Sequence, residues 1–293
     1  MANLKEVRTR IASVDSTRKI TSAMKMVSAS KLRRAQNAIQ QMRPYAHKLH
    51  ELLENLSGAI SQTNHPLFTQ REEVNSVLLV VISSNRGLCG SFNSNVIKQI
   101  NHLTEVTYKE VAQNNKLHYI TIGKRISEHV DRFYGNLILS QDELTESPSF
   151  EEISNMANMI MNKFAEGNYD KVEIVYHEFR NAASQVLITE TYLPIKPLEQ
   201  IEENDFPTDY IYQPDRDSIT NDLVPKILKI QLFKALLDSV ASEHGARMTA
   251  MHQATDNATE LLKDLKLQYN KARQAAITTE ILEIVSGAEA LDN

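Results

Sequence analysis

A short glycine-containing turn is the first place in this sequence where the residue types could do chemistry. It runs from Ser83 to Ser91, with the letters SSNRGLCGS, directly after an apolar run and before a predicted helix. A turn between a buried strand and a helix can bind phosphate through free backbone N–H groups. The spacing matches neither the dinucleotide fingerprint nor a phosphate-binding loop that ends in Gly-Lys-Ser/Thr. The sequence therefore predicts no nucleotide or other cofactor at this turn.

Cys89, inside this turn, is the single cysteine of the chain. A cysteine nucleophile needs a neighbouring base, and none of the nine histidines forms a recognisable partner motif with it. A single cysteine also excludes an internal disulfide and is typical of a reducing compartment. His244 interrupts an apolar helical seam, where we expect it to pack between helices rather than to bind a metal. We predict no catalytic residue and no metal site.

The turn lies within residues 70–195, a segment with the pattern of a small α/β domain. Residues 77–82 read VLLVVI, a continuous apolar run of the kind expected for a strand buried on both faces. The other predicted elements are a helix from about Asn93 to Asn114, strands over 117–123 and 137–139, a helix after Pro148, and a hairpin of residues 172–179 and 186–192. This order of elements favours a mixed sheet.

Residues 1–60 are predicted to form one long helix. Apolar residues step by three and four from Leu4 to Val14 and again after Ala35, which is a heptad seam. The phase slips between these two stretches, and such a slip changes the local supercoil. We expect Pro44 to bend the helix without ending it, because the apolar steps continue beyond it.

Residues 223–293 are predicted to form a second long helix, after an acidic, proline-interrupted linker at residues 196–222. A strict three/four grid from Leu223 to Thr279 has 17 positions, of which 13 are apolar. Such a helix is about 80–100 Å long. Seams at the two ends of a chain most simply pair with each other. Because the domain between them reverses the chain, we expect an antiparallel coiled coil.

The net charge of −5 conceals a basic N-terminal arm. Residues 1–50 carry 11 Lys or Arg and 2 Asp or Glu, a balance of +9, so the remaining 243 residues carry −14. This asymmetry indicates an acidic partner for the arm, which could be nucleic acid, anionic lipid or an acidic protein loop. No apolar run approaches the roughly 18–20 residues that span a bilayer, and no apolar signal core follows the first residues. We expect a soluble protein of the cytoplasm or of the inner side of an energy-coupling membrane.

Several motifs resemble those of the gamma subunits of rotary ATP synthases of the bacterial type. They are ITSAMKMVSASKL from Ile20, SSNRGLCGSFN from Ser83, EHGARMTAM from Glu243 with ATDNA from Ala254, and YNKARQAAITTEI from Tyr269 with EIVSGA from Glu283. The likeness runs from residue 2 to about residue 291 in the family's order. It implies a mixed α/β fold: a long antiparallel coiled coil of the terminal helices with a small central α/β domain. It also implies a rotating, non-catalytic central stalk that couples proton or sodium flow to ATP synthesis.

The resemblance further implies the partners and the residues that meet them. The helix pair would thread the hexamer of alpha and beta subunits, while the central domain would contact epsilon and the membrane c-ring. The complex would lie on the cytoplasmic face of the bacterial plasma (inner) membrane, with this chain as a peripheral member. The expected partner contacts are Met24 and Lys25 at the hexamer's acidic levers, Arg86 and Cys89 at its lower loops, Arg273, Gln274 and Thr278 at a loop of a catalytic subunit, and Tyr210 and Tyr212 toward the rotor ring. Capping of the domain core is the alternative role for the two tyrosines.

The residues alone leave two other classes of protein open. An α/β enzyme with helical oligomerisation arms would need convergent His, Asp, Glu or phosphate-binding groups within residues 74–193, and none stands out. A basic coiled coil that binds nucleic acid would show a steep salt dependence. The Ala/Ser/Met-rich seam and the acidic remainder argue against it, so we predict no nucleic-acid partner. The basic residues can also form an ordinary solvated face.

Overall fold

The structure is a computed structural model that describes residues 4–291 except 61–65, 70, 72, 183 and 196–215. The chain divides into two compact units. Unit 1 comprises residues 1–28 and 247–293, and unit 2 comprises residues 29–246. The two long helices, α1 (Leu4–Ile60) and α6 (Arg216–Leu291), each contribute to both units.

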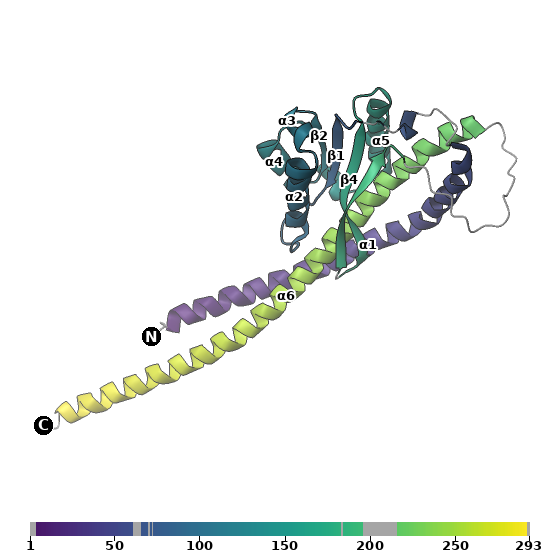
Figure 1. Ribbon diagram of the computed structural model, residues 1–293. Helices are drawn as coiled ribbons and strands as arrows, with labels where there is room; N and C mark the ends of the chain where they lie inside the picture. Colours follow the sequence, from purple (N-terminus) through teal and green to yellow (C-terminus); the bar gives the residue numbers. More distant parts are fainter. Residues whose placement is uncertain are drawn as a thin grey trace. The chain divides into compact units, whose positions relative to one another are not determined.

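Unit 1 is a pair of helix segments, from the start of α1 and the end of α6. The segments lie side by side and run in opposite directions, so the ends marked N and C lie toward the same end of the pair (Figure 1). Small and medium-sized side chains fill the buried seam: Val7, Thr21 and Ser28 from α1, and Met251, Ala258, Leu262 and Leu265 from α6. The predicted antiparallel pairing of the terminal helices is confirmed in this unit.

Both long helices contain a proline that does not end them. α1 is 57 residues long and continues through Pro44, as the apolar steps predicted. α6 is 76 residues long, continues through Pro225, and begins at Arg216 rather than near residue 223. An ion pair between Lys226 Nζ and Asp222 Oδ2, at 2.6 Å, links successive turns near this start, and pairs with this spacing stabilise helices.

Unit 2 contains a five-stranded mixed sheet, as predicted. The strands are β1 (Val77–Ile82), β2 (Leu117–Ile122), β3 (Leu137–Ser140), β4 (Lys171–Asn181) and β5 (Ser184–Leu193). Their order is β3-β2-β1-β4-β5, and all neighbours are parallel except β4 and β5, which form the predicted antiparallel hairpin. All six residues of central strand β1 are fully buried, as its VLLVVI sequence requires.

Helices cover both faces of the sheet (Figure 1). One face packs against α2 (Phe92–His102), the π turn η2 (Leu103–Thr107), α3 (Lys109–Gln113) and α4 (Lys124–Phe133). On the other face, the Tyr192 hydroxyl donates to the Leu228 carbonyl of α6 at 3.0 Å. The helix α5 (Phe150–Ala165) contacts α6 there through the rings of Phe150 and Phe233. Two 3-10 turns, η1 (Pro66–Phe68) and η3 (Glu143–Thr145), complete the unit's short elements.

Two local predictions need correction. The helix expected from Asn93 to Asn114 is interrupted by η2, where a buried hydrogen bond of 2.7 Å joins the hydroxyls of Thr104 and Tyr119. Thr104 lies within η2 and Tyr119 lies on β2, so this bond joins the interruption of the helix to the sheet. The helix α4 was not predicted, because its core contact rests on little more than Ile126 and Val130.

Candidate functional site

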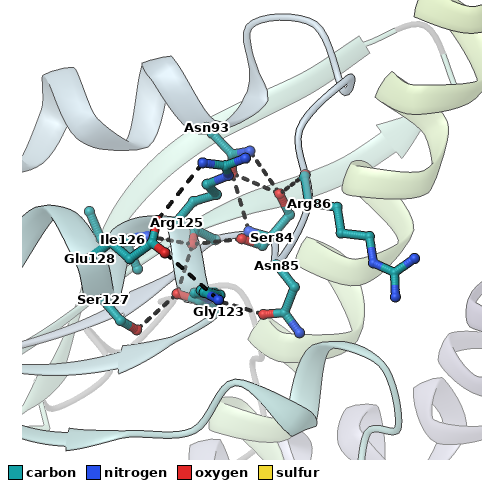
Figure 2. A network of polar contacts seen from close by, with 11 residues as sticks. Ser84, Asn85, Arg86, Asn93, Gly123, Arg125, Ile126, Ser127 and Glu128 are labelled. Carbon is teal, nitrogen blue, oxygen red and sulfur yellow. Dashed lines mark hydrogen bonds and ion pairs between the residues drawn. The ribbon is translucent and has the colours of Figure 1, made fainter.

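The turn between β1 and α2 lies at the carboxyl end of the parallel strands, the edge where open α/β sheets bind ligands. Its first half is closed by Asn93 from α2 (Figure 2). The Ser84 backbone N–H donates to Asn93 Oδ1 at 3.2 Å, and Asn93 Nδ2 donates to Ser84 Oγ at 2.8 Å. The Ser84 hydroxyl also lies 2.7 Å from the Arg86 carbonyl, to which it donates. The turn is therefore a fixed structure with internal partners.

The first turn of α4 is tied to this turn through its backbone N–H groups. Lys124 N donates to Asn85 Oδ1 at 3.0 Å, and Arg125 N donates to the Ser84 carbonyl at 3.2 Å. Ile126 N donates to Ser83 Oγ at 3.1 Å. These are the free donors with which a helix N-terminus binds phosphate. Here they hold two loops together, so this geometry does not favour nucleotide binding.

Gly123 allows the two loops to approach this closely. Its φ of +104° lies in a region that residues with a Cβ rarely adopt. A Cβ added at this position would collide with the backbone carbonyl of Ser83. The Ser83 hydroxyl in turn donates to the Gly123 carbonyl at 3.2 Å. The contact between the β1 and β2 loops therefore depends on glycine at position 123.

Within the turn Cys89 is buried, whereas Arg86 and Leu88 are exposed. Cys89 is 1% exposed, and its Sγ accepts a hydrogen bond of 3.3 Å from Asn93 Nδ2. In contrast, Leu88 is 64% exposed with a left-handed φ of +61°. Figure 2 shows the exposed Arg86 side chain pointing away from the network. Of the two predicted contact residues here, Arg86 faces outward, whereas Cys89 holds the turn from within.

Leu88 was missed by sequence reasoning. An apolar residue between a glycine and a cysteine in a turn is a weak signal, and nothing in the pattern reveals its positive φ. Two cations of this region take part in exposed ion pairs, Arg86 with Glu146 at 3.4 Å and Arg125 with Glu128 at 3.8 Å. Exposed pairs of this kind contribute about 0–1 kcal/mol. The turn thus presents an apolar side chain among exposed basic ones.

In the closing part of α6, no side chain of residues 273–287 is buried. Every residue from Arg273 to Gly287 is exposed, in a helix that continues to Leu291. The predicted contact residues Arg273, Gln274 and Thr278 lie within an arc of about 140° on this helix. The Thr278 hydroxyl donates to the Gln274 carbonyl at 2.9 Å, so it is oriented along the helix.

Large apolar side chains are exposed on the same part of α6. Ile277, Ile281 and Ile284 follow a helical spacing, and Ile284 is 68% exposed. Val285 is exposed on the same face, and Leu282 is exposed about 140° around the helix from Ile277. Apolar surface of this extent marks interaction sites on soluble proteins. The residue types alone would suggest a buried core helix, whereas in unit 1 these side chains are exposed.

On α1, Met24 and Lys25 are half-buried, while three neighbouring apolar residues, Ile20, Met26 and Val27, are exposed. From the sequence, Ile20 and Val27 lie off the first register of the seam, whereas Met26 was expected to pack in the seam and is instead 66% exposed. Close by, Asp15 is paired with Lys19 and Arg18 at 2.9 Å each.

The hydrogen bonds of Asp15 with Lys19 and then Arg18 lower the pKa of its carboxyl. Asp15 and Glu6 are the two acidic residues among the first 50, so most of the basic arm has no acidic neighbour along its own helix.

The predicted contact residues form separate groups. A hydrogen bond joins Thr21 of α1 to Thr255 of α6, which sets the register of unit 1. In an antiparallel pair this places Met24 level with His252, about 30 Å along the axis from Arg273. Arg86 and Cys89 share the turn in unit 2. Tyr210 and Tyr212 lie outside the residues that the structure describes.

Two groups of buried ionisable side chains in unit 2, at His177 and at Lys171, have structural partners rather than the arrangement of a catalytic site. His177 is buried, stacks on Phe92 with ring centroids 4.2 Å apart, and has its pKa lowered to about 4 by burial. The Lys171 ammonium lies 2.6 Å from Glu173 Oε1 and 3.0 Å from the Tyr108 hydroxyl. Burial raises the pKa of Tyr108 to about 12. Within the described ranges, no three His, Cys, Asp or Glu side chains gather as metal ligands would.

Comparison with known proteins places the chain among close relatives. The family model described as ATP synthase matches residues 3–291. The ATP synthase gamma chain of Flavobacterium johnsoniae is 52% identical over 295 residues, covering all of both chains. That of Cytophaga hutchinsonii is 48% identical over 295 residues, again with full coverage.

Solved structures share the fold. The central stalk and c-ring structure of the Tetrahymena thermophila mitochondrial ATP synthase contains a chain with a TM-score of 0.59 and 26% identity, covering 80% of this chain and 99% of that one. A chain of the Euglena gracilis mitochondrial ATP synthase has a TM-score of 0.66 and 21% identity, covering 98% and 94%. Among the residues that the structure describes, no helix is long and apolar enough to span a membrane.

Proposed function

The chain belongs to the family of ATP synthase gamma chains, and from this membership we infer that it is the rotating central-stalk subunit of an ATP synthase. It is not itself an enzyme: ATP is made or hydrolysed between other subunits of the complex. Its partners are the alpha and beta subunits of the catalytic hexamer, the c-ring of the membrane rotor and the epsilon subunit. Proton flow through the membrane rotor turns the stalk.

The exposed closing part of α6 is the observation that carries this function. A helix with fifteen consecutive exposed residues, many of them apolar, cannot be accounted for by the packing of unit 1. It fits a helix that is surrounded by other proteins on all sides, as a stalk inside a ring would be. Apolar contacts are suited to this, because they are non-directional and can be exchanged as the stalk turns.

The stalk acts by differential binding. A helix pair inside a ring of three catalytic sites contacts each site differently at any moment, so one orientation stabilises the closed state of one site over another. A ligand or subunit shifts an equilibrium only by its difference in affinity for the two states. Turning the stalk moves this difference from site to site.

The individual contact residues follow as part of the proposal. Arg273, Gln274 and Thr278 bind a loop of a catalytic subunit, and their exposure on one arc of α6 supports this role. Met24 and Lys25 lie beside the hexamer's acidic levers. The +9 balance of residues 1–50 supports that position, since basic side chains facing acidic loops attract without a fixed geometry.

The turn after β1 supplies a second contact. Arg86 reaches the lower loops of the hexamer, and Cys89 keeps the turn in the conformation that presents Arg86. Tyr210 and Tyr212 are proposed to face the rotor ring. As a member of a membrane-bound complex, the chain lies on the cytoplasmic face of the bacterial plasma membrane. Fractionation of cells that carry a tagged chain would test this last point: the chain should sediment with membranes and be released with the hexamer.

Truncation of α6 tests the proposed function. The chain is co-expressed with alpha and beta subunits either in full, ending at Asn270, or ending at Glu289 as a control for loss of the extreme end. Removal of residues 271–293 should leave the melting temperature of the chain unchanged, since residues 273–287 are exposed in unit 1. ATPase turnover and recovery of the complex should fall only for the chain ending at Asn270. A full-length chain that never co-purifies with the hexamer would refute the proposal.

A further inference from the structure

A polar contact between the two helices lies in the middle of the seam of unit 1, which also buries Ser28 and Arg247. The hydroxyl oxygens of Thr21 on α1 and Thr255 on α6 are 2.8 Å apart, although the residues are 234 positions apart in the chain. Thr21 is 8% exposed, so its hydroxyl is largely shielded from water. A hydrogen bond of this kind contributes about 0.5–1.5 kcal/mol, which a slip of one helix along the other would lose. This pair therefore favours one alignment of the two helices over others.

The surrounding hydrogen bonds show which hydroxyl donates. The Thr255 hydroxyl lies 2.7 Å from the Met251 carbonyl and donates to it, which uses its one proton. The bond between the threonines is then donated by Thr21. Thr21 has an alternative acceptor on its own helix, the Arg18 carbonyl, at the longer distance of 3.1 Å. The result is a short relay from α1 through Thr255 to the backbone of α6.

The rest of the seam specifies alignment weakly near this pair. Ser28 and Ala258, two of its buried neighbours, are small, and Met24 is only half-buried. Met251, one turn from Thr255, is large and buried, but its unbranched side chain adapts to different neighbours. Small side chains leave shallow holes, so one helix can slide along the other with little loss of packing. A polar residue in an apolar seam is the best-attested device for fixing register in coiled coils.

The register determines how far α6 extends beyond α1. From Thr21 back to Leu4 is 17 residues, which carries Thr255 forward to Ala272. Beyond Ala272, α6 continues to Leu291 without α1 beside it. A slip of one helical turn would change the length of this extension by about 5 Å. It would move the exposed side chains from Arg273 onward by the same amount.

We propose that the Thr21–Thr255 hydrogen bond is a register lock, which sets the axial position of α1 against α6 and so the reach of the closing part of α6. The two threonines are positioning residues, because they act through the placement of other side chains. The lock itself is a property of the chain alone. Its effect on coupling rests on the proposed function.

Distance measurements between spin labels on the full-length chain test the lock. Labels at Thr9→Cys and Gln253→Cys occupy exposed positions of unit 1, about 20 Å apart along the axis. Cys89 is buried and does not compete for the label. The test variants are Thr21→Val alone and Thr21→Val with Thr255→Val, which keep the shape and remove the hydroxyls. Thr259→Val is the matched control, because its exposed hydroxyl bonds only the Thr255 carbonyl of the same helix, at 2.8 Å.

The wild-type chain and the Thr259→Val control should each give one narrow distance distribution. The double valine variant should give a second population displaced by about 5 Å per turn slipped, with helix content unchanged. Thr21→Ser, which keeps the hydroxyl, should restore the single distance. A double valine variant with the wild-type distribution would overturn the lock, and so would a second population in the Thr259→Val control.

Function is then measured in the assembled complex. The double valine variant should pump fewer protons per ATP hydrolysed than Thr259→Val does, by about twofold or more, at equal thermal stability. If the wild-type complex does not pump at all, the proposed function fails while the distance result still decides the lock. If both variants pump as wild type although the register has shifted, the consequence for coupling is wrong.

Discussion

Gly123→Ala should be among the most damaging single substitutions in unit 2, although it adds one methyl group. The position has φ +104°, and a Cβ there would meet the Ser83 carbonyl. A non-glycine residue in this backbone region costs about 1–3 kcal/mol. Relief of the collision by moving the backbone costs about 1–3 kcal/mol more. We therefore expect the contact between the β1 and β2 loops to weaken by about 2–6 kcal/mol.

Two other glycines in the same region separate the two causes. Gly90 has φ +60° with nothing within 4 Å of an added Cβ, so Gly90→Ala has backbone strain without a collision. Its cost should be about 1 kcal/mol. Gly87 has an ordinary φ, and the nearest atom to its added Cβ is Arg125 Nη2 at 3.9 Å. Gly87→Ala should therefore be close to neutral.

The buried thiol of Cys89 supplies the assay, because it is the single cysteine and lies inside this turn. Under native conditions its labelling rate by a thiol reagent follows the population of the opened turn. Since about 1.4 kcal/mol is a factor of ten, Gly123→Ala should label at least about 25-fold faster than wild type. Gly90→Ala should label about fivefold faster, and Gly87→Ala within about twofold. If Gly123→Ala labels no faster than Gly90→Ala, the collision with Ser83 has no energetic weight and our reasoning is wrong.

Three further outcomes follow from buried or exposed side chains. Burial lowers the pKa of His177 to about 4, so between pH 6.5 and 4 the unfolded chain binds a proton that the folded chain does not, and the free energy of unfolding falls as the pH drops. Urea titrations should show about 2 kcal/mol less stability at pH 5 than at pH 7. A His177→Phe variant should lack this component. Thr104→Val leaves the buried Tyr119 hydroxyl without the 2.7 Å bond it now makes, so the free energy of unfolding in urea should drop by about 1–3 kcal/mol; an unchanged value would contradict the role given to η2. Replacement of Ile281 and Ile284 by serine should change the chain's own free energy of unfolding by no more than about 0.5 kcal/mol, because both side chains are exposed. The same replacement should weaken co-assembly with alpha and beta subunits by about 3 kcal/mol or more. Equal recovery of the complex would argue against contact at these positions.

The main elements of the fold could be read from local patterns. The run VLLVVI could only be a fully buried strand, and β1 is central and completely buried. The long heptad seams required partners, and the antiparallel pairing of α1 and α6 follows from their places in the chain. Ser149 before an apolar helical face marked the start of α5, and its hydroxyl accepts from the Glu152 N–H at 3.4 Å.

Features that depend on distant residues could not be read in this way. The helix α4 buries Ile126 and Val130 in only ten residues, and most of its other side chains are charged, so its periodicity is too brief to separate from a loop. The interruption at η2 depends on a hydroxyl that β2 supplies, which no local window contains.

The candidate site divides in the same manner. The family motifs pointed to Arg86 and Cys89 as partner contacts, which stay predictions, but did not reveal that Cys89 is buried while Leu88 is exposed with positive φ. That arrangement is set by Asn93 and by the first turn of α4, both outside the turn. The exposure of residues 273–287 likewise depends on where α1 begins. The apolar three/four spacing within α6 carries no information about that position.

The 234 residues between Thr21 and Thr255 also have a consequence during synthesis of the protein. A ribosome adds about 5–20 residues per second, so the seam of α1 emerges about 12–47 seconds before the part of α6 that will cover it. During this time the nascent helix must stay soluble without its partner. Where the seam consists of Thr21 and Ser28, it offers little large apolar surface through which it could associate with other nascent chains. The weak packing that makes a polar lock useful in the finished coiled coil is therefore also what allows its first half to wait for its second.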